Sequence, residues 1–420
     1  MESQISKTPA TRKLPLTGVG WLDIGAAERE LVNQVMDRGL VNRFYSFEAD
    51  APPQMAETLE REFRQKMGRE YALAVTSGTA ALGVALDALE IGPGDEVILP
   101  AYSWISCATA VLRCGARPVL AEIDETLNLA PGEIARLSTP QTKAALVVHY
   151  QGVAADMEPI FNEAAKRGLI VIEDCASSCG ASYRGRRVGS MGTIGCYSFQ
   201  TNKMMTCGDG GMVVMDDARL FERAVRAHDL GLVRPVHEKQ LAGLNQPGFA
   251  GAQYRMTELN AAVALAQLRK LDGYITRCRE MTARVMKKIG NLPGLTFRRI
   301  PDASGDLGIE SYFWPDSLAK TVKLRERIAA RGVDCNKRTK TYSHFYRDYI
   351  SARSMAKSGS SPLMGPEPWP VEGYRPEDFP FSEDIGHRML ALPMSILFSD
   401  DDVDFIANAV CEAHAEVIGG

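Results

Sequence analysis

Between residues 55 and 215, short apolar runs alternate with segments in which apolar residues recur every three or four positions. The runs are rich in aliphatic and β-branched residues, which predicts strands, whereas the periodic segments predict helices. Strands are expected at residues 71–75, 96–99, 118–123, 144–149, 169–172 and 196–199. Helices are expected at residues 55–66, 80–89, 105–114 and 157–166. Strands that alternate with helices of about ten residues predict a largely parallel sheet with helices on both faces.

A different pattern follows in the second half of the chain. Apolar positions at helical spacing run from Thr257 to about Ile289, and shorter mixed elements follow at residues 295–298, 310–314, 324–331 and 400–417. The pattern predicts an N-terminal tail and helix at residues 1–50, a large α/β domain at 51–275 and a smaller α+β domain at 276–420. Residues 351–376 are rich in Ser, Pro and Gly, and we expect them to form a long surface loop.

The charge balance and the hydropathy narrow the class of protein. The 420 residues carry 48 basic and 52 acidic side chains, a net charge of −4, so there is no basic excess for binding nucleic acid. The longest uncharged stretch, residues 97–112, contains Pro100 and several hydroxyl residues and is shorter than the roughly 20 apolar residues that span a bilayer. The sequence therefore predicts a protein that neither binds nucleic acid nor enters a membrane.

The N-terminus and the cysteines indicate the compartment. The first residues carry charges but no apolar core or small-residue cleavage site, which is typical of a frayed tail rather than a signal peptide. The nine cysteines are an odd number and are expected to be free thiols in a reducing compartment, which predicts a cytoplasmic location. Cys175 and Cys179 lie four positions apart, but no second pair follows at zinc-site spacing, so no metal site is expected.

Glycines concentrate around one lysine. Eight of the 37 glycines fall between Gly180 and Gly211, and such a density lets the backbone fold closely around a ligand. Lys203 lies in this segment, after the strand expected at residues 196–199. A lysine is usually a solvated surface charge, but in apolar surroundings its pKa falls and its amine becomes a nucleophile that can form a Schiff base.

Asp174 follows the strand expected at residues 169–172, where ligands of parallel sheets gather. A helix cap or a turn would also explain an aspartate at this position. Pyridoxal phosphate (PLP), however, needs a carboxylate against its ring nitrogen in order to act as an electron sink. Asp174 and Lys203 together therefore favour a PLP site.

Two further strand ends offer groups for the same ligand. Ser77, Gly78 and Thr79 join an expected strand to an expected helix, where backbone N–H groups and the helix dipole would face a phosphate, although plain helix capping is the alternative. Trp104 follows the strand expected at residues 96–99 and offers a flat face to a cofactor ring, although ordinary half-buried packing would also explain it.

Seven blocks of the sequence resemble, in order and spacing, the DegT/DnrJ/StrS-type aminotransferases. They are SGTAALGVAL, GDEVILPAYSW, GARPVLAEIDETLNLAP, VVHYQGVAADM, IEDCASSCGASYRGRRVGSMG, SFQTNKMMTCGDGG and QYRMTELNAAVALAQL. The resemblance is strong over about residues 20–290 and looser beyond, where LALPMSILFSDDDVDFI is similar to the family's closing segment. It implies a fold type I PLP-dependent transferase, with residues 51–275 as the PLP-binding domain.

The resemblance also implies roles for individual residues. Lys203 would bind PLP covalently and carry the proton, Asp174 would meet the ring nitrogen, and Trp104 would stack on the ring. The residues implied for the phosphate are Gly78, Thr79, Ala80 and Ser198. The active site would lie at a homodimer interface, where Gln253–Met256 would reach the partner's phosphate.

Three positions depart from the family's pattern. Ser177 stands where Gln or His is usual near the cofactor's phenolic oxygen, and it is too short for the same contact without a water. Gln253 replaces an Asn, and Asp209 replaces a Glu. These departures concern the geometry around the cofactor and not its identity.

The implied reaction is a ping-pong transamination. An amino acid, glutamate or glutamine, would give its amino group to a keto group of a sugar, nucleotide sugar or cyclitol. A hydroxyl-rich acceptor needs hydrogen-bonding partners. The candidates are Asn42, Arg43, Tyr45, Tyr183, Lys337, Arg338, Lys340, Tyr342 and His344, and a solvated face is the alternative for the last five.

Other functions on the same fold remain open from the sequence. A dehydratase of the family would carry histidine in place of Lys203. A lyase or cysteine desulfurase would need its own nucleophile, for which Cys335 is a candidate. A non-catalytic PLP-binding regulator is the third alternative, and the departures at Ser177 and Gln253 leave it open.

Overall fold

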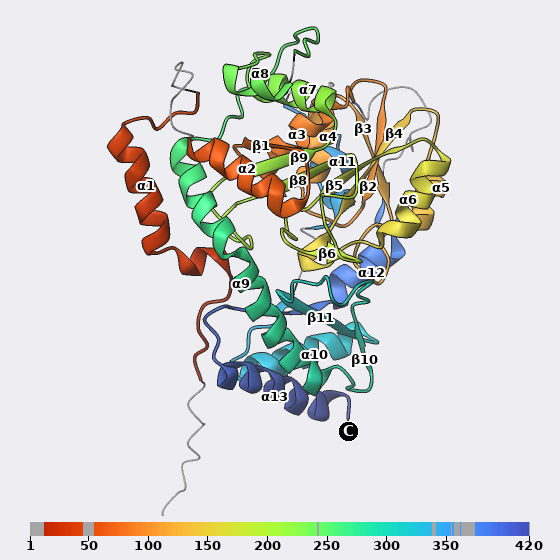
Figure 1. Ribbon diagram of the computed structural model, residues 1–420. Coiled ribbons are helices and arrows are strands. Elements are labelled where there is room, and N and C mark those ends of the chain that lie inside the picture. Colours follow the sequence, from red (N-terminus) through yellow and green to blue (C-terminus); the bar gives the residue numbers. More distant parts are fainter. Residues whose placement is uncertain are drawn as a thin grey trace, which may run out of the picture.

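The computed structural model describes residues 12–44, 54–241, 243–337, 342–353, 355–356, 362 and 374–419. In these residues the chain forms two main sheets that are joined by a long helix (Figure 1). Most of the loop expected at residues 351–376 lies outside the described residues.

A seven-stranded sheet forms the centre of the larger part. Its strands are β1 (Tyr71–Val75), β2 (Glu96–Pro100), β3 (Arg117–Ala121), β4 (Thr142–Val148), β5 (Ile170–Asp174), β8 (Ile194–Ser198) and β9 (Gly211–Met215). Their order across the sheet is β1-β9-β8-β5-β4-β2-β3. Strand β9 runs antiparallel to both neighbours, and all other pairs are parallel. The largely parallel sheet is confirmed, and each expected strand overlaps one of these strands.

Both faces of this sheet are buried. In β1, Ala72 and Ala74 belong to one apolar cluster, and Leu73 and Val75 belong to a second one. Successive side chains of a strand point to opposite faces, so the two clusters lie on opposite sides of the sheet. This double burial explains why the strands are continuous apolar runs rather than alternating ones.

Helices supply the covering layers. Those of the larger part are α1 (Ala26–Arg38), α2 (Met55–Met67), α3 (Gly78–Ala88), α4 (Ser106–Arg113), α5 (Pro131–Leu137), α6 (Met157–Lys166), α7 (Ala218–His228) and α8 (Pro235–Leu241). Helix α2 contributes Phe63 to the first cluster and α3 contributes Leu86 to the second, so they cover opposite faces. A short hairpin, β6 (Ser182–Tyr183) and β7 (Arg186–Arg187), follows β5.

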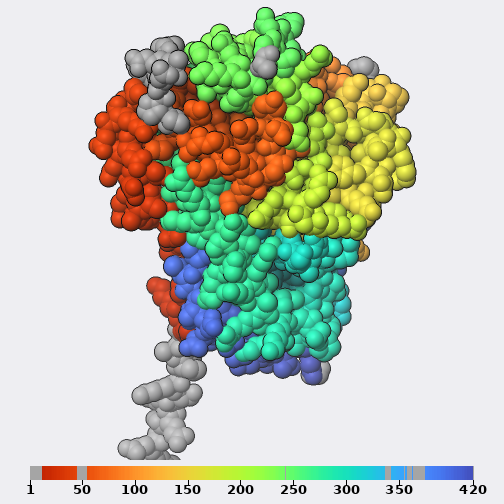
Figure 2. Space-filling model, viewed as in Figure 1, coloured from red at the N-terminus to blue at the C-terminus, as the bar shows by residue number. Residues whose placement is uncertain are grey.

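The smaller part contains an antiparallel sheet in the order β10-β11-β13-β12. Its strands are β10 (Leu295–Phe297), β11 (Glu310–Pro315), β12 (Asn336–Lys337) and β13 (Leu390–Pro393). Its helices are α10 (Leu318–Ala330), α11 (Asp348–Ser351), α12 (Pro380–Arg388) and α13 (Asp400–Val417). In the space-filling view most of these residues, coloured cyan to blue, lie below the larger part (Figure 2).

Helix α9 (Glu258–Ile289) connects the two parts. It packs on α1 and α2 in the larger part and on α13 in the smaller part (Figure 1). The boundary expected after residue 275 falls inside this continuous helix. No helix of the described residues has the length and the apolar character that crossing a membrane requires.

Candidate active site

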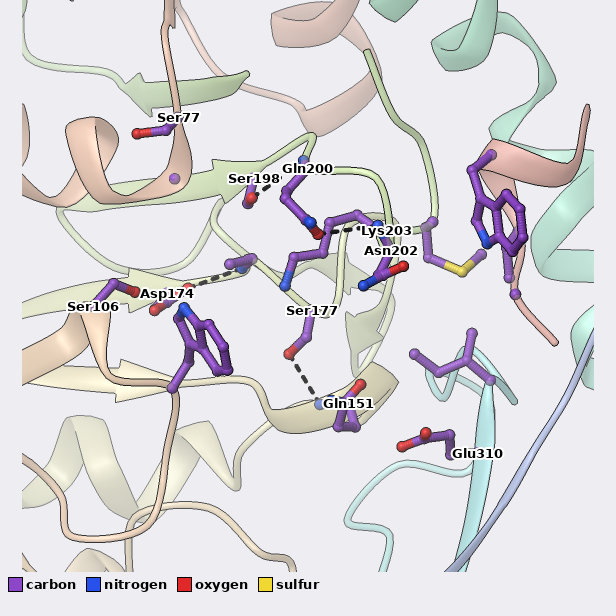
Figure 3. A pocket seen from close by; sticks show the side chains of 18 of the residues that line it. Ser77, Ser106, Gln151, Asp174, Ser177, Ser198, Gln200, Asn202, Lys203 and Glu310 are labelled. Atoms are coloured by element: carbon purple, nitrogen blue, oxygen red, sulfur yellow. Dashed lines mark hydrogen bonds between the residues drawn. The ribbon is translucent and has the colours of Figure 1, made fainter. Parts of the chain in front are cut away.

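A cavity of about 540 Å³ opens where the large sheet, the small sheet and the N-terminal segment meet. From the large sheet, residues at or after the strand ends line it: Ser77, Gly78, Thr79, Trp104, Gln151, Asp174, Ser177, Ser198 and Lys203. Figure 3 shows several of these side chains around the cavity. The cavity thus lies at the carboxyl ends of the strands, where ligands of such sheets bind.

Asp174 forms a buried part of the cavity floor at the end of β5 and is 3% exposed. Its Oδ1 accepts the N–H of Ala176 at 2.9 Å, and its Oδ2 accepts the thiol hydrogen of Cys107 at 3.2 Å. Both of these donors are uncharged groups. A buried carboxylate at the floor of a cavity is suited to receive a positively charged group of a ligand.

Lys203 lies in the turn between β8 and β9. The turn is closed by backbone bonds from Phe199 N to Gly210 O at 2.8 Å and from Cys207 N to Phe199 O at 3.0 Å. It also packs closely on the end of β1, because a Cβ at Gly211 would lie 2.5 Å from the Ser77 carbonyl oxygen. The Lys203 side chain extends into the cavity on the side of Asp174 (Figure 3).

The N-terminus of α3 borders the cavity beside Ser198. The Oγ of Ser77 accepts the N–H of Ala80 at 3.0 Å and caps the helix, while Gly78 and Thr79 line the cavity. A Cβ at Gly78 would lie only 2.7 Å from the Ser198 Cβ, so glycine is required for this approach. Helix N-termini bind phosphates through free N–H groups and the dipole. Ala80, expected in this cradle, is buried, and its N–H is already bonded to Ser77.

Trp104 lies at the edge of the cavity with 50% of its surface exposed. Its ring is 5.8 Å from that of Tyr342, centroid to centroid, and the two rings are tilted by 56°. Tyr342 comes from the C-terminal part of the chain and also lines the cavity. The indole therefore presents an aromatic face at the place where the predicted cofactor ring would lie.

Comparison with known proteins decides the family. The model of the DegT/DnrJ/EryC1/StrS aminotransferase family matches residues 24–411. The chain belongs to this family. The GDP-perosamine synthase of Escherichia coli O157:H7 is 31% identical over 390 residues, which are 93% of this chain and 96% of that protein.

Solved structures agree with this assignment. The 3-amino-5-hydroxybenzoic acid synthase has a TM-score of 0.80 and 27% identity, covering 96% of this chain and 100% of that one. The aminotransferase of Psychrobacter cryohalolentis has a TM-score of 0.80 and 27% identity, covering 95% and 99%. DesI, solved in the presence of its TDP-sugar product, has a TM-score of 0.76 and 25% identity, covering 98% and 95%.

This chain is therefore a PLP-dependent aminotransferase with the predicted α/β fold. The relatives support the predicted sugar aminotransferase function and give no support to the dehydratase, lyase or regulator alternatives. The cavity also fits PLP. Asp174 offers a buried carboxylate to a protonated ring nitrogen, and the close approach of Gly78 to Ser198 leaves a space at the N-terminus of α3 that a Cβ would fill.

Ser177 lines the cavity, but its hydroxyl is already engaged. The Oγ accepts the N–H of Gln151 at 3.0 Å and donates to the His149 carbonyl oxygen at 3.0 Å (Figure 3). Gln151 has a φ of +45°, a left-handed conformation that is strained for a residue with a side chain. The departure at Ser177 therefore fixes the turn that presents Gln151 to the cavity.

Gln253 does not line this cavity. It is exposed and pairs with Asp229 in an isolated β-bridge, and the neighbouring Arg255 forms an ion pair with the same aspartate. Leu230 and Leu232, which follow Asp229 in the sequence, are 54% and 47% exposed. A contact between Gln253 and a phosphate would thus have to be made in a second copy of the chain.

Most of the residues expected to bind the acceptor lie elsewhere. Tyr342 lines the cavity as expected. Arg43 is buried and bonds both carboxylate oxygens of Glu60, at 2.6 and 2.7 Å, so it neutralises a buried charge instead. Tyr183 donates its hydroxyl to Asp156 at 2.8 Å, and His344 is fully buried. None of the three lines the cavity, because each side chain is bonded to another group inside the protein.

The other acceptor candidates give no support to the prediction. Asn42 is exposed and does not line the cavity. The structure does not describe Tyr45, Arg338, Lys340 or the side chain of Lys337.

The N-terminal segment contributes a wall that the sequence did not predict. Thr17, Gly18 and Trp21 line the cavity, and so does Glu310 of β11 (Figure 3). Gly18 has a φ of +135°, and a Cβ there would lie 2.2 Å from the Trp21 Nε1, so the indole packs directly on this glycine. In the sequence, this segment stands out only by Gly18 and Gly20, and their spacing matches no dinucleotide-binding motif.

The structure bears on two questions about the cysteines: whether Cys335 is a reactive nucleophile, and whether a metal could bind near Cys175. Burial raises the pKa of the Cys335 thiol, so this buried cysteine stays protonated and is not a reactive nucleophile. His149, Glu173 and Cys175 lie within reach of one metal ion. However, the Nε2 of His149 bonds Glu173 at 2.9 Å and its Nδ1 accepts the N–H of Ala155 at 3.1 Å, so neither ring nitrogen is open to a metal.

Proposed function

We propose that this aminotransferase moves the amino group of glutamate to the keto carbon of a nucleotide-linked sugar, in two half-reactions. The observation that carries the proposal is that Lys203 and Asp174 share one cavity with the N-terminus of α3. The same cavity is walled on its other side by hydrogen-bonding and aromatic groups, among them Thr17, Trp21 and Glu310.

Each residue has a defined task in this proposal. PLP, when bound, withdraws electrons from the donor's Cα. Asp174 holds the ring nitrogen through a charged hydrogen bond, and Gly78 and Ser198 hold the phosphate. Trp104 covers one face of the ring. In each half-reaction the Nζ of Lys203 would move one proton, from the donor's Cα to the cofactor carbon in the first and from the cofactor carbon to the acceptor's former keto carbon in the second, which is general acid–base catalysis by one amine.

We infer the kind of acceptor from the relatives and from the size of the cavity. One relative is named for a GDP-linked sugar, and another was solved with a TDP-sugar. Beside the main cavity lies a second one of about 520 Å³, and Thr17 and Pro393 line both. Arg12 and Lys13 line the second cavity, where their basic side chains would face a diphosphate, and Arg12 also forms an ion pair with Asp402 at 2.6 Å.

We also propose that two copies share their active sites and that the enzyme works in the cytoplasm. The exposed Leu230 and Leu232 beside Gln253 support an interface at this place. All nine cysteines are free thiols, and most are buried, which supports a reducing compartment.

Spectroscopy of the purified enzyme tests the catalytic assignment. The wild type should show the visible absorption of lysine-bound PLP, and glutamate should remove this band. Lys203→Ala should lose the covalent link and at least about a thousandfold in the half-reaction, because both the nucleophile and the proton carrier are absent. Lys323→Ala, on an exposed face of α10, is the matched control and should resemble the wild type.

A panel of keto compounds then tests the acceptor. Nucleotide-linked keto sugars should restore the band of the wild type, whereas free keto sugars and carbocyclic ketones should do so more slowly. A colourless wild type, or a Lys203→Ala variant that is still reduced by borohydride to a covalent adduct, would contradict the catalytic assignment. Faster reaction with a free or carbocyclic ketone would contradict the nucleotide-linked acceptor only.

A further inference from the structure

We propose that Gln151 binds a hydroxyl group of the keto acceptor and that Arg298 positions Gln151 for this contact. The inference rests on the proposed amination of a hydroxyl-bearing acceptor, and it names a residue that selects this acceptor. It gives a function to two features that the chemistry at Lys203 does not use. One is a strained residue in the cavity wall, and the other is a buried arginine that bonds its backbone.

Gln151 offers a free amide to the cavity. It is one of the residues that line the cavity (Figure 3), and in the described part of the chain its side chain forms no hydrogen bond with another protein group. An amide both donates and accepts, and so does a hydroxyl group, so the two can bond in either direction. Carboxylates such as those of glutamate are bound more strongly by cationic groups. The neutral amide therefore favours the acceptor over the amino donor.

The backbone of Gln151 supports a role in binding. Its φ is +45° and its ψ is +61°, which is a left-handed conformation that residues with a side chain rarely adopt. Such conformations persist only where the surroundings hold them, and they cluster at ligand sites. Glycine would form the same turn without strain. A side chain at this position is therefore explained by what it binds and not by the turn itself.

The larger part of the molecule holds the N–H groups of this turn. Each of the three consecutive N–H groups donates to a side chain that belongs to the larger part. The turn is thereby fixed to the carboxyl end of β4, at the cavity. The bonds run from Tyr150 to the Oδ1 of Asn128 at 2.8 Å, from Gln151 to the Oγ of Ser177 at 3.0 Å and from Gly152 to the Oγ of Ser178 at 3.0 Å.

The smaller part holds the carbonyl groups of the same turn. The guanidinium of Arg298, which directly follows β10, donates to the carbonyl oxygens of Tyr150 at 2.7 Å and of Gln151 at 3.4 Å. The N–H of Leu307 donates to the carbonyl oxygen of Gly152 at 3.1 Å. The turn thus joins the two parts, and its geometry depends on both of them.

Arg298 is itself held in one place. It is 7% exposed, and its Nε donates to the Thr126 carbonyl oxygen at 2.7 Å. The guanidinium also lies over two aromatic rings, 5.6 Å from the centroid of Tyr150 and 5.5 Å from that of Tyr312. A planar guanidinium that is fixed on several sides keeps its donors in a constant position. The conformation of Gln151 therefore depends on a residue 147 positions away in the sequence.

Gln151→Gly tests the binding role, because glycine removes the amide and adopts the left-handed conformation without strain. The holoenzyme variant should melt at or above the wild-type temperature. The KM of the acceptor should rise about tenfold, as expected for one lost hydrogen bond. In a series of acceptor analogues that each lack one ring hydroxyl, the variant should lose about tenfold of the wild type's preference at one ring position. The half-reaction with glutamate should stay within about twofold of the wild type.

Arg184→Gly is the matched control. Arg184 also has a left-handed backbone, with a φ of +49°, but it is exposed in the hairpin of β6 and β7 and does not line the cavity. This variant should keep the wild-type KM for the acceptor. Equal changes of this KM in the two glycine variants would overturn the proposal. It would also be overturned if Gln151→Gly raised the KM of glutamate instead, because the amide would then bind the amino donor.

Arg298→Met tests the positioning role, because it removes the bonds to both carbonyl oxygens and keeps an apolar side chain of similar length. It should raise the KM of the acceptor about as much as Gln151→Gly does, and the double variant should be no worse than either single one. Arg298→Lys, which keeps a charge and a donor, should be intermediate. Arg299→Met is the control, because the neighbouring Arg299 pairs with Asp124 and Asp156 at the surface.

The double variant also separates the possible failures. Effects of Gln151→Gly and Arg298→Met that multiply in the KM of the acceptor would show that Arg298 acts independently of Gln151, and would refute the positioning role. The same conclusion follows if Arg298→Met slows the glutamate half-reaction as much as the acceptor half-reaction. A wild type that aminates no keto compound of the panel would refute the proposed function itself, which is seen before any variant is compared.

Discussion

Because Gly78 has no side chain, the start of α3 can lie close to Ser198, and we expect phosphate binding to depend on this approach. A Cβ would come within 2.7 Å of the Ser198 Cβ, so Gly78→Ala must push the start of α3 away from β8. We expect at least about a tenfold weaker PLP affinity, since one helix N–H bond to a phosphate is worth that much. Equilibrium binding of PLP to the apoenzyme measures it.

Gly83 in the same helix provides the control for that prediction. A Cβ there would meet no atom within 4 Å, so alanine adds only helix propensity, about 1 kcal/mol of stability. Gly83→Ala should thus bind PLP like the wild type and melt slightly higher. Equal losses of PLP affinity in both variants would show that the close approach at Gly78 is unimportant.

Glu173 is the residue whose ionisation should govern acid stability near the site. Burial alone would raise its pKa, but hydrogen bonds from His149, Gly192 and Gly189 outweigh burial and lower it. A lowered folded-state pKa stabilises the protein above the unfolded value, near pH 4.3, and this stability is lost as the pH falls through the folded value. Glu173→Gln should cost about 1–3 kcal/mol at pH 7 and flatten the acid limb.

Denaturant unfolding between pH 7 and pH 3 measures this effect. Glu238→Gln, on the exposed face of α8, is the control and should leave the curve as it is in the wild type. An acid limb that is equally steep in the wild type and in Glu173→Gln would assign the acid loss of stability to other groups.

At the scale of helices and strands, the elements that the sequence predicted well are those whose faces are buried. The strands of the large sheet are buried on both faces, so their apolar runs stand out, and α2, α3, α4 and α6 lie close to their expected positions. The residues directly after β1, β2 and β5 were correctly expected to share one cavity. These predictions need only local patterns and the geometry of parallel sheets.

Elements that meet through distant contacts were not predictable in this way. The segment Leu16–Trp21 reaches the cavity because Ser395 Oγ donates to the Leu16 carbonyl oxygen at 2.6 Å and Gly18 N–H donates to that of Met394 at 3.3 Å. No periodicity marks a pairing across nearly 380 positions. His344 was misplaced for the related reason that a sequence does not show whether a polar side chain finds a buried partner.

The N-terminal segment should therefore affect the acceptor rather than the cofactor. Trp21 lines the cavity together with Thr17 and Gly18, and among the described residues its indole N–H bonds no protein group. Trp21→Ala should raise the KM of the keto acceptor about tenfold through loss of a ring contact and a donor. PLP affinity and the glutamate half-reaction should change less than twofold.

The second tryptophan of the cavity supplies the contrast. Trp104→Ala should weaken PLP binding, because its exposed face is proposed to cover the cofactor ring. Stopped-flow kinetics of the two half-reactions separates the effects. If Trp21→Ala impairs the glutamate half-reaction as much as the acceptor half-reaction, the proposed division of the cavity into a cofactor side and an acceptor side is wrong.

At the scale of the whole molecule, large apolar side chains are exposed both at the cavity and beside Gln253. Trp104, Leu230 and Leu232 are each about half exposed, at 50%, 54% and 47%. Exposed apolar side chains that form a contiguous patch mark an interface, and we propose that these residues belong to one. Gln253 lies beside Leu230 and Leu232 and outside its own chain's cavity, which is the placement expected of a residue that acts in a partner's site.

Subunit mixing tests this arrangement directly. Lys203→Ala should be inactive, and Gln253→Ala should lose about tenfold in PLP affinity if its amide bonds the partner's phosphate. Mixed dimers of the two variants would contain one site with both an intact Lys203 and a partner's intact Gln253. At limiting PLP, unfolding and refolding the variants together should therefore restore activity well above that of either variant alone. Activity that only equals the average of the two variants would place Gln253 outside the shared site, whatever the oligomeric state.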